Sequence, residues 1–111
     1  MITNSVFTPL YTGSLSHSAV SASATSQLLI DASYQRRKLS LYNHSGASLF
    51  IRYSTSLDHS ASLGTFTVKL SSGSYYEMAN PIYTGQIHGI WDAEDGVVMI
   101  TQLEEEDQSG W

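Results

Sequence analysis

Apolar and polar residues alternate along much of the chain, and this two-residue period predicts β-strands. The alternation is clear over five segments, which are 38–42, 49–53, 66–70, 87–91 and 97–103, and the turn at 71–74 leads into a sixth strand at 75–78. No window carries a 3.6-residue apolar period of useful length. Short strands separated by frequent turn residues are typical of antiparallel sandwiches and small barrels. The sequence therefore predicts an all-β protein, an antiparallel β-sandwich of jelly-roll-like form.

Turn residues punctuate these strands. Asn43-His44-Ser45-Gly46 separates the strands at 38–42 and 49–53, so it predicts a hairpin between them. Asn80-Pro81 ends the strand that begins at Tyr75, because proline cannot donate to a ladder. The last strand, 97–103, is apolar on both faces, which predicts a position inside a sheet or at an interface.

The first 30 residues differ from the rest because they carry no formally charged side chain. Alternation over 20–25 predicts a weak strand at 20–30. Residues 1–30 as a whole have too few large apolar side chains to build a core of their own. We expect an extended arm over 1–30 that lies along another surface; the alternative is a flexible leader. Residues 31–103 would form the sandwich and 104–111 an acidic tail. The arm's candidate partner contacts are Val6, Phe7, Leu10, Tyr11 and Leu15.

Composition narrows the function classes. The net charge of −5 argues against general nucleic-acid binding, which needs a cationic face. The absence of cysteine excludes disulfides, thiolate metal sites and cysteine nucleophiles. No apolar run reaches the ~18 residues that a membrane span needs, and the N-terminus lacks the features of a signal peptide.

Candidate catalytic groups form no recognisable pattern. The four histidines lack the spacing that metal ligation favours, and no Gly-x-Ser-x-Gly elbow occurs. A Ser–His–acid triad, or a carboxylate pair from Glu77 and Asp92, remains an alternative that makes the chain a small hydrolase. We expect no enzyme activity, no cofactor and no metal.

Two further motifs each allow two interpretations. The basic run Arg36-Arg37-Lys38 either protects a strand edge from unwanted pairing or grips an acidic partner, with Arg36 and Arg37 as partner contacts. The aromatic residues near the end of the chain either pack across strands or form a platform for sugars. Tyr76 and Trp91 are the candidate glycan-binding residues.

A family resemblance covers roughly residues 36–103. It is carried by the run from Arg37 to Tyr53, by Thr67–Leu70, by Gly73–Glu77, and by Tyr83–Trp91 followed by Gly96 and Ile100-Thr101. These segments resemble the strands of small virion proteins from tailed bacteriophages. The resemblance implies a capsid decoration (cement) protein or a head–tail accessory protein, and it supplies no catalytic residues.

The expected function follows from this resemblance. The protein would be made in the cytoplasm of a bacterial host and would bind the capsid surface of the virion, where it braces subunit junctions. Its partners would be the major capsid protein or other virion proteins. A homo-oligomer is expected, with a trimer favoured, and no contact with nucleic acid or membrane. The alternative is a receptor- or glycan-binding module of a tail or head fibre.

Overall fold

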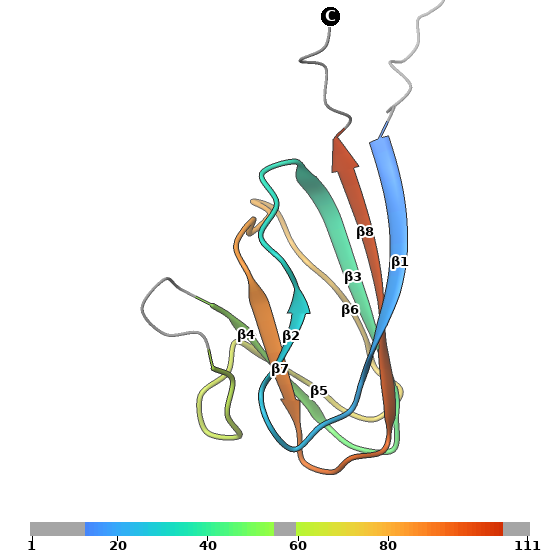
Figure 1. The fold of residues 1–111 in the computed structure, drawn as a ribbon, viewed down its shortest axis with the longest axis vertical. Coiled ribbons are helices and arrows are strands. Elements are labelled where there is room, and N and C mark those ends of the chain that lie inside the picture. The colour runs from blue at the N-terminus through green and yellow to red at the C-terminus, as the bar shows by residue number, and fades with distance from the viewer. Residues whose placement is uncertain (1–12, 55–59, 106–111) are drawn as a thin grey trace, which may run out of the picture.

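The computed structural model describes residues 13–54 and 60–105, which form eight strands and no helix. The strands are β1 (Gly13–Ser21), β2 (Gln27–Ile30), β3 (Arg36–Ser45), β4 (Leu49–Tyr53), β5 (Val68–Leu70), β6 (Tyr75–Glu77), β7 (Ile87–Trp91) and β8 (Gly96–Glu105). They build two four-stranded antiparallel sheets that pack face to face (Figure 1). The predicted all-β sandwich is confirmed.

Strands that follow each other in the sequence mostly lie in different sheets. Sheet A has the order β1-β8-β3-β6 and sheet B the order β2-β7-β4-β5. Only β4 and β5 follow each other within one sheet; every other connection crosses from one sheet to the other. The chain therefore closes most of its turns at the ends of the sandwich.

The predicted hairpin between the strands at 38–42 and 49–53 is wrong. β3 pairs with β6 and β8, whereas β4 pairs with β5 and β7. The turn after β3 carries Ala47 into the core and takes the chain across to sheet B. The Asn43 side chain supports this crossing, because its amide nitrogen donates to the carbonyls of Ala47 (2.8 Å) and Leu70 (3.0 Å). Turn residues thus fix where the chain reverses, but not whether it stays in the same sheet.

The core lies between the sheets and is built from the inward members of each alternating strand. Its most buried apolar side chains are Leu39, Leu41, Leu49, Ile51, Ile87, Trp91, Val98 and Ile100. These side chains come from β3 and β8 of sheet A and from β4 and β7 of sheet B. In each strand every second residue points into the core, so the two-residue period of the sequence is the period of burial. β8 lies inside sheet A between β1 and β3, as its apolar sequence predicts.

The predicted arm over 1–30 is not confirmed for the residues that the structure describes. Residues 13–21 form β1, which pairs with β8 along its whole length, and residues 27–30 form β2, which pairs with β7. The predicted strand at 20–30 is therefore two strands, one in each sheet. Val6, Phe7, Leu10 and Tyr11 lie outside the described residues, as does most of the predicted acidic tail.

Candidate assembly surface

Arg36 was a predicted partner contact, and its burial contradicts that role. Only 1% of its surface is exposed. Its Nε donates to Gln102 Oε1 (2.7 Å), and its terminal nitrogens donate to the carbonyls of Asp31 (2.6 Å), Tyr83 (2.5 Å) and Gly85 (3.2 Å). The guanidinium therefore ties three segments that are distant in sequence, and its five donors suit this task.

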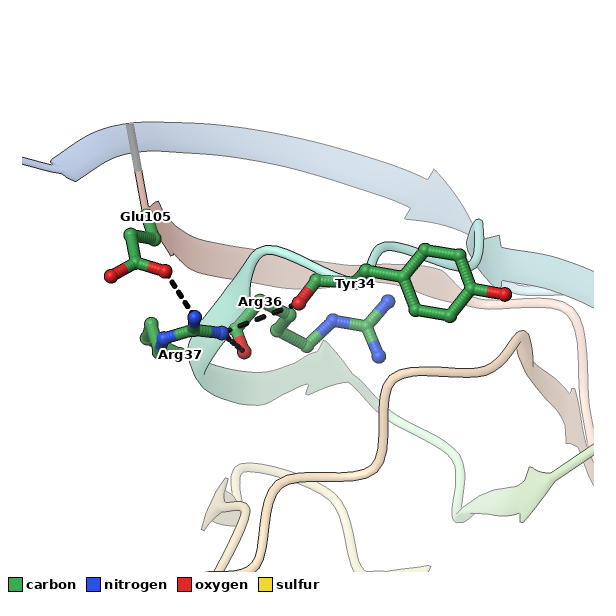
Figure 2. A network of polar contacts seen from close by, with 4 residues as sticks. All are labelled: Tyr34, Arg36, Arg37 and Glu105. Carbon is green, nitrogen blue, oxygen red and sulfur yellow. Dashed lines mark hydrogen bonds and ion pairs between the residues drawn. The ribbon is translucent and has the colours of Figure 1, made fainter. Parts of the chain in front are cut away.

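The two neighbouring arginines have different surroundings. Desolvation lowers the pKa of Arg36, while the nearby Glu104 carboxylate opposes that effect by favouring the charged form. Arg37 is exposed, pairs with Glu105 and donates to the carbonyl of Tyr34 (3.3 Å; Figure 2). Of the two arginines predicted to contact a partner, Arg37 is therefore on the surface and Arg36 is not.

The predicted glycan residues do not form a platform. Trp91 is fully buried, and its Nε1 donates to Asn43 Oδ1 (3.3 Å) inside the sandwich. Tyr76 is half-buried, and its hydroxyl hydrogen-bonds to that of Tyr53, which stacks on Tyr83 with ring centroids 5.1 Å apart. The prediction is wrong for Trp91 because alternation shows which residues share a face, but not which face points inward.

Large exposed side chains gather on the outer face of sheet A. The strand register aligns Ala19, Met99, Tyr42 and Tyr75 in one row that crosses all four strands. Met99 is 44% exposed and Tyr75 is 61% exposed, and Tyr42 lies between them. We call these four residues the sheet A band.

The rows beside the band add apolar surface and little charge. Leu15 on β1, a predicted partner contact, is exposed and lies opposite Leu103 on β8. The charged groups at the border of this face are paired: Lys38 Nζ lies 3.0 Å from Glu77 Oε2, and Arg37 pairs with Glu105. The register also places the polar residues His17, Ser40 and Thr101 on this face, so it combines exposed apolar and polar side chains with a neutralised border.

Sheet B has a different outer face. Phe50 points outward from β4, but only 8% of its surface is exposed. Phe66 packs edge-on against it with ring centroids 5.0 Å apart, and Lys69 Nζ lies 5.5 Å from its ring centroid. Ala61 is also buried, and its N–H donates to Ser26 Oγ (3.0 Å). The β4–β5 connection thus covers Phe50, while its own Leu63 and Phe66 stay exposed.

β1 has little burial of its own. It is the edge strand of sheet A, and eight of its nine residues are exposed. The side chains of β1 are exposed on both faces, so the strand is held in place chiefly by its backbone pairing with β8. Sequence reasoning missed this strand because no buried face imposes a strong pattern on it.

A hollow lies where three turns meet at one end of the sandwich. It has a volume of about 430 Å³, and its lining includes Tyr42, His44, Ser72 and Asp95. The rings of Tyr42 and His44 stack with centroids 5.7 Å apart, and Asp95 Oδ2 accepts the N–H of Gly46 (3.1 Å). We call this hollow the turn pocket. Its residues are far apart in sequence, so no local motif signals it.

The acid pair weighed as a hydrolase site has structural partners. Glu77 pairs with Lys38, and Asp92 Oδ1 accepts the N–H of Ser48 (2.9 Å). The two carboxylates come from different parts of the fold, β6 and the turn after β7. Each carboxylate therefore has a local role in holding the fold.

A serine–histidine contact also occurs. Ser54 Oγ lies 2.5 Å from His88 Nδ1, but Ser54 is almost completely buried. Within residues 13–54 and 60–105, no group of three or more His, Cys, Asp or Glu side chains is placed to hold a metal ion. The same residues contain no helix long and apolar enough to cross a membrane.

No family model, curated protein or solved structure matches this chain. The surfaces described above and the resemblance over residues 36–103 are the features that bear on the function of the chain.

Proposed function

We propose that this chain is a structural protein of a tailed-bacteriophage virion, a capsid decoration (cement) protein or a nearby accessory protein. It would dock on the assembled shell through the outer face of sheet A. The resemblance over residues 36–103 supplies the class of assembly. We also infer a jelly roll, because an order of 1-8-3-6 facing 2-7-4-5 suits eight strands wound as two Greek keys.

The sheet A band is the observation that carries the proposal. Tyr42, Tyr75 and Met99 are large, partly exposed and aligned in one row. Aromatic residues and methionine are enriched where proteins meet, and clustered apolar exposure marks interaction surfaces. A sheet face of this kind fits a broad protein surface better than a small ligand.

The charge of the face indicates the chemistry of the partner. Lys38 and Glu77 neutralise each other beside the band. A surface with few unpaired charges gains little binding energy from charge attraction to a partner. Salt screens charge attraction, so it should weaken binding through such a surface only slightly. We therefore expect a partner surface that is apolar and weakly charged, with binding that persists at high ionic strength.

The test uses particles purified from the phage or prophage that encodes the chain. Immunogold electron microscopy should place the protein on the head. Stripped particles should rebind purified wild-type protein in a sedimentation assay. The double variant Tyr42→Asp/Met99→Asp should lose most of this binding, because it puts two carboxylates into the interface while leaving the core unchanged.

The matched control is Tyr34→Asp, which changes a 92% exposed residue in the β2–β3 connection. It should bind like the wild type. Absence of the protein from purified particles would overturn the proposal, and so would full binding by the double variant. Label confined to the tail fibres would favour the alternative function below.

A glycan-binding role for a fibre module is the second candidate, and the turn pocket favours it. A partly exposed tyrosine ring, hydroxyl groups and a carboxylate line this pocket, and such groups bind sugars through stacking and hydrogen bonds. A glycan array should then give signals that Tyr42→Ala and Asp95→Asn abolish. Tyr75→Ala, on the same sheet but outside the pocket lining, is the control.

A further inference from the structure

We propose that β1 pairs with β1 of a second copy of this chain, antiparallel about a two-fold axis that passes beside His17. The pairing would join two A sheets into one continuous eight-stranded sheet. The inference goes beyond docking on a shell, since the occupant is another copy of the chain and no virion partner is required.

Among the residues that the structure describes, none pairs with the outer edge of β1, so its backbone has a free edge there. β1 is the terminal strand of sheet A, and β8 occupies its other side (Figure 1). The N–H of Ala22 donates to the carbonyl of Gly96 (2.9 Å) at the end of this ladder. Because antiparallel pairing alternates every second residue, the even-numbered residues of β1 face β8. Leu15, His17 and Ala19 therefore direct their N–H and C=O groups to the free edge.

This edge has none of the usual protection against pairing. β1 contains no proline and no formally charged residue, and its nine pairs with β8 run without a register shift. Natural sheets usually protect an edge with charges, proline, bulges or short strands. The other described edges have such features: β2 has a register shift, while β5 and β6 have three residues each and carry Lys69 and Glu77.

The same comparison identifies the occupant. β1 is nine residues long, and the other three described edge strands have at most four. In a ring of copies, such as the expected trimer, β1 of one copy would pair with a different edge strand of the next copy, and that strand would have to be equally long. Among the described edge strands, only β1 has this length, so β1 of a second copy is the matching partner. Two β1 strands also meet without like-charge repulsion between them, because β1 has no formally charged residue, and a self-complementary contact closes as a dimer.

The backbone pattern also fixes the register. Residues that direct their N–H and C=O groups to the free edge must face each other as hydrogen-bonded pairs. Full overlap of Gly13–Ser21 then places His17 opposite His17 of the second copy, and Leu15 opposite Ala19. Each copy would add its sheet A band to one shared face, so a shell would be bound through two bands at once.

Cysteine cross-linking tests this register, because the chain contains no native cysteine. Hydrogen-bonded antiparallel pairs have Cα atoms about 5.5 Å apart, a separation that a disulfide spans. His17→Cys should therefore form a covalent dimer rapidly under mild oxidation. Ser16→Cys is the register control, because in this register residue 16 faces residue 18 of the second copy. Ala93→Cys, in an exposed turn, reports random collision.

Cross-linking of His17→Cys no faster than that of Ala93→Cys would overturn the proposal. Cross-linking of Ser16→Cys in preference to His17→Cys would overturn it too, because that result places the axis elsewhere.

A proline variant tests the pairing without a cross-link. Light scattering of the purified wild-type chain should give twice the mass of one chain. Ala19→Pro removes an N–H that faces the free edge and leaves the ladder to β8 in place, so it should give a folded monomer. Circular dichroism checks that the fold is retained. A monomeric wild type, or a folded Ala19→Pro variant that still dimerises, would overturn the proposal. Neither measurement involves a capsid, so failure here is distinct from failure of shell binding.

Discussion

The two sheets of the sandwich share one core but differ on their outer faces. On sheet B, Phe50 is covered by Phe66 from the β4–β5 connection and by Lys69 on β5. On sheet A, Met99 and Tyr75 remain exposed. The difference lies at the centre of each outer face, where the chain's own residues cover Phe50 on sheet B but leave Met99 and Tyr75 exposed on sheet A.

The strand order explains why only sheet B is covered. β4 and β5 are the consecutive strands that share a sheet, so the connection between them is free to fold back over that sheet. Arg52 Nη1 holds this connection by donating to the carbonyl of Ser60 (2.9 Å). Every connection that leaves a strand of sheet A crosses to sheet B, and therefore closes an end of the sandwich.

The largest expected effect lies where the sheets meet. Trp91→Ala removes a fully buried side chain and the indole N–H that donates to Asn43 Oδ1. The free energy of unfolding should therefore fall by about 3–5 kcal/mol. Tyr75→Ala, on the outer face of sheet A, should change it by less than about 0.5 kcal/mol. Urea denaturation measures both. A similar loss for the two variants would show that sheet A's outer face is packed in the isolated chain.

An intermediate effect tests the two outer faces against each other. Phe66→Ala exposes Phe50 and removes an edge-on ring contact, so the isolated chain should lose about 1 kcal/mol. Met99→Ala should cost the isolated chain less, but it should weaken binding to the assembly. Denaturation and sedimentation with particles measure the two properties. The comparison of faces fails if Phe66→Ala weakens particle binding more than Met99→Ala does.

The sequence predicts the strands well wherever one face is buried. Leu39, Leu41, Leu49 and Ile51 alternate in the sequence and are all buried between the sheets. It does not predict sheet membership, because Asn43–Gly46 reverses the chain equally well within a sheet or between sheets. The hairpin prediction failed for that reason. Pairing partners depend on contacts between residues that are distant along the chain.

The candidate site was harder to predict than the fold. Arg36 looks like a surface cation, but its acceptors are Gln102 and backbone carbonyls 5 to 49 residues away, and no local pattern reports them. β1 is weakly patterned because both of its faces are exposed. The sheet A band became visible only when the register aligned Met99 with Tyr42 and Tyr75. Exposed surfaces leave little periodic signal, and partner-binding surfaces are of that kind.

The smallest expected effect concerns the ion pair at the border of the sheet A band. Hydrogen bonding and charge attraction from Glu77 raise the pKa of Lys38. A lysine whose pKa is raised by folding adds stability below its unfolded value of about 10.4, and loses that contribution as the pH rises through the folded value. Lys38→Gln should therefore lower the melting temperature slightly at pH 7. The deficit should shrink above about pH 10.4 and in high salt, because both groups are solvated. Thermal melts across pH measure this, and Glu77→Gln, which removes the other partner of the same pair, should give a similar small deficit at pH 7. A deficit that persists at high pH would mean that the aliphatic stem of Lys38, and not its charge, supports the border of the band.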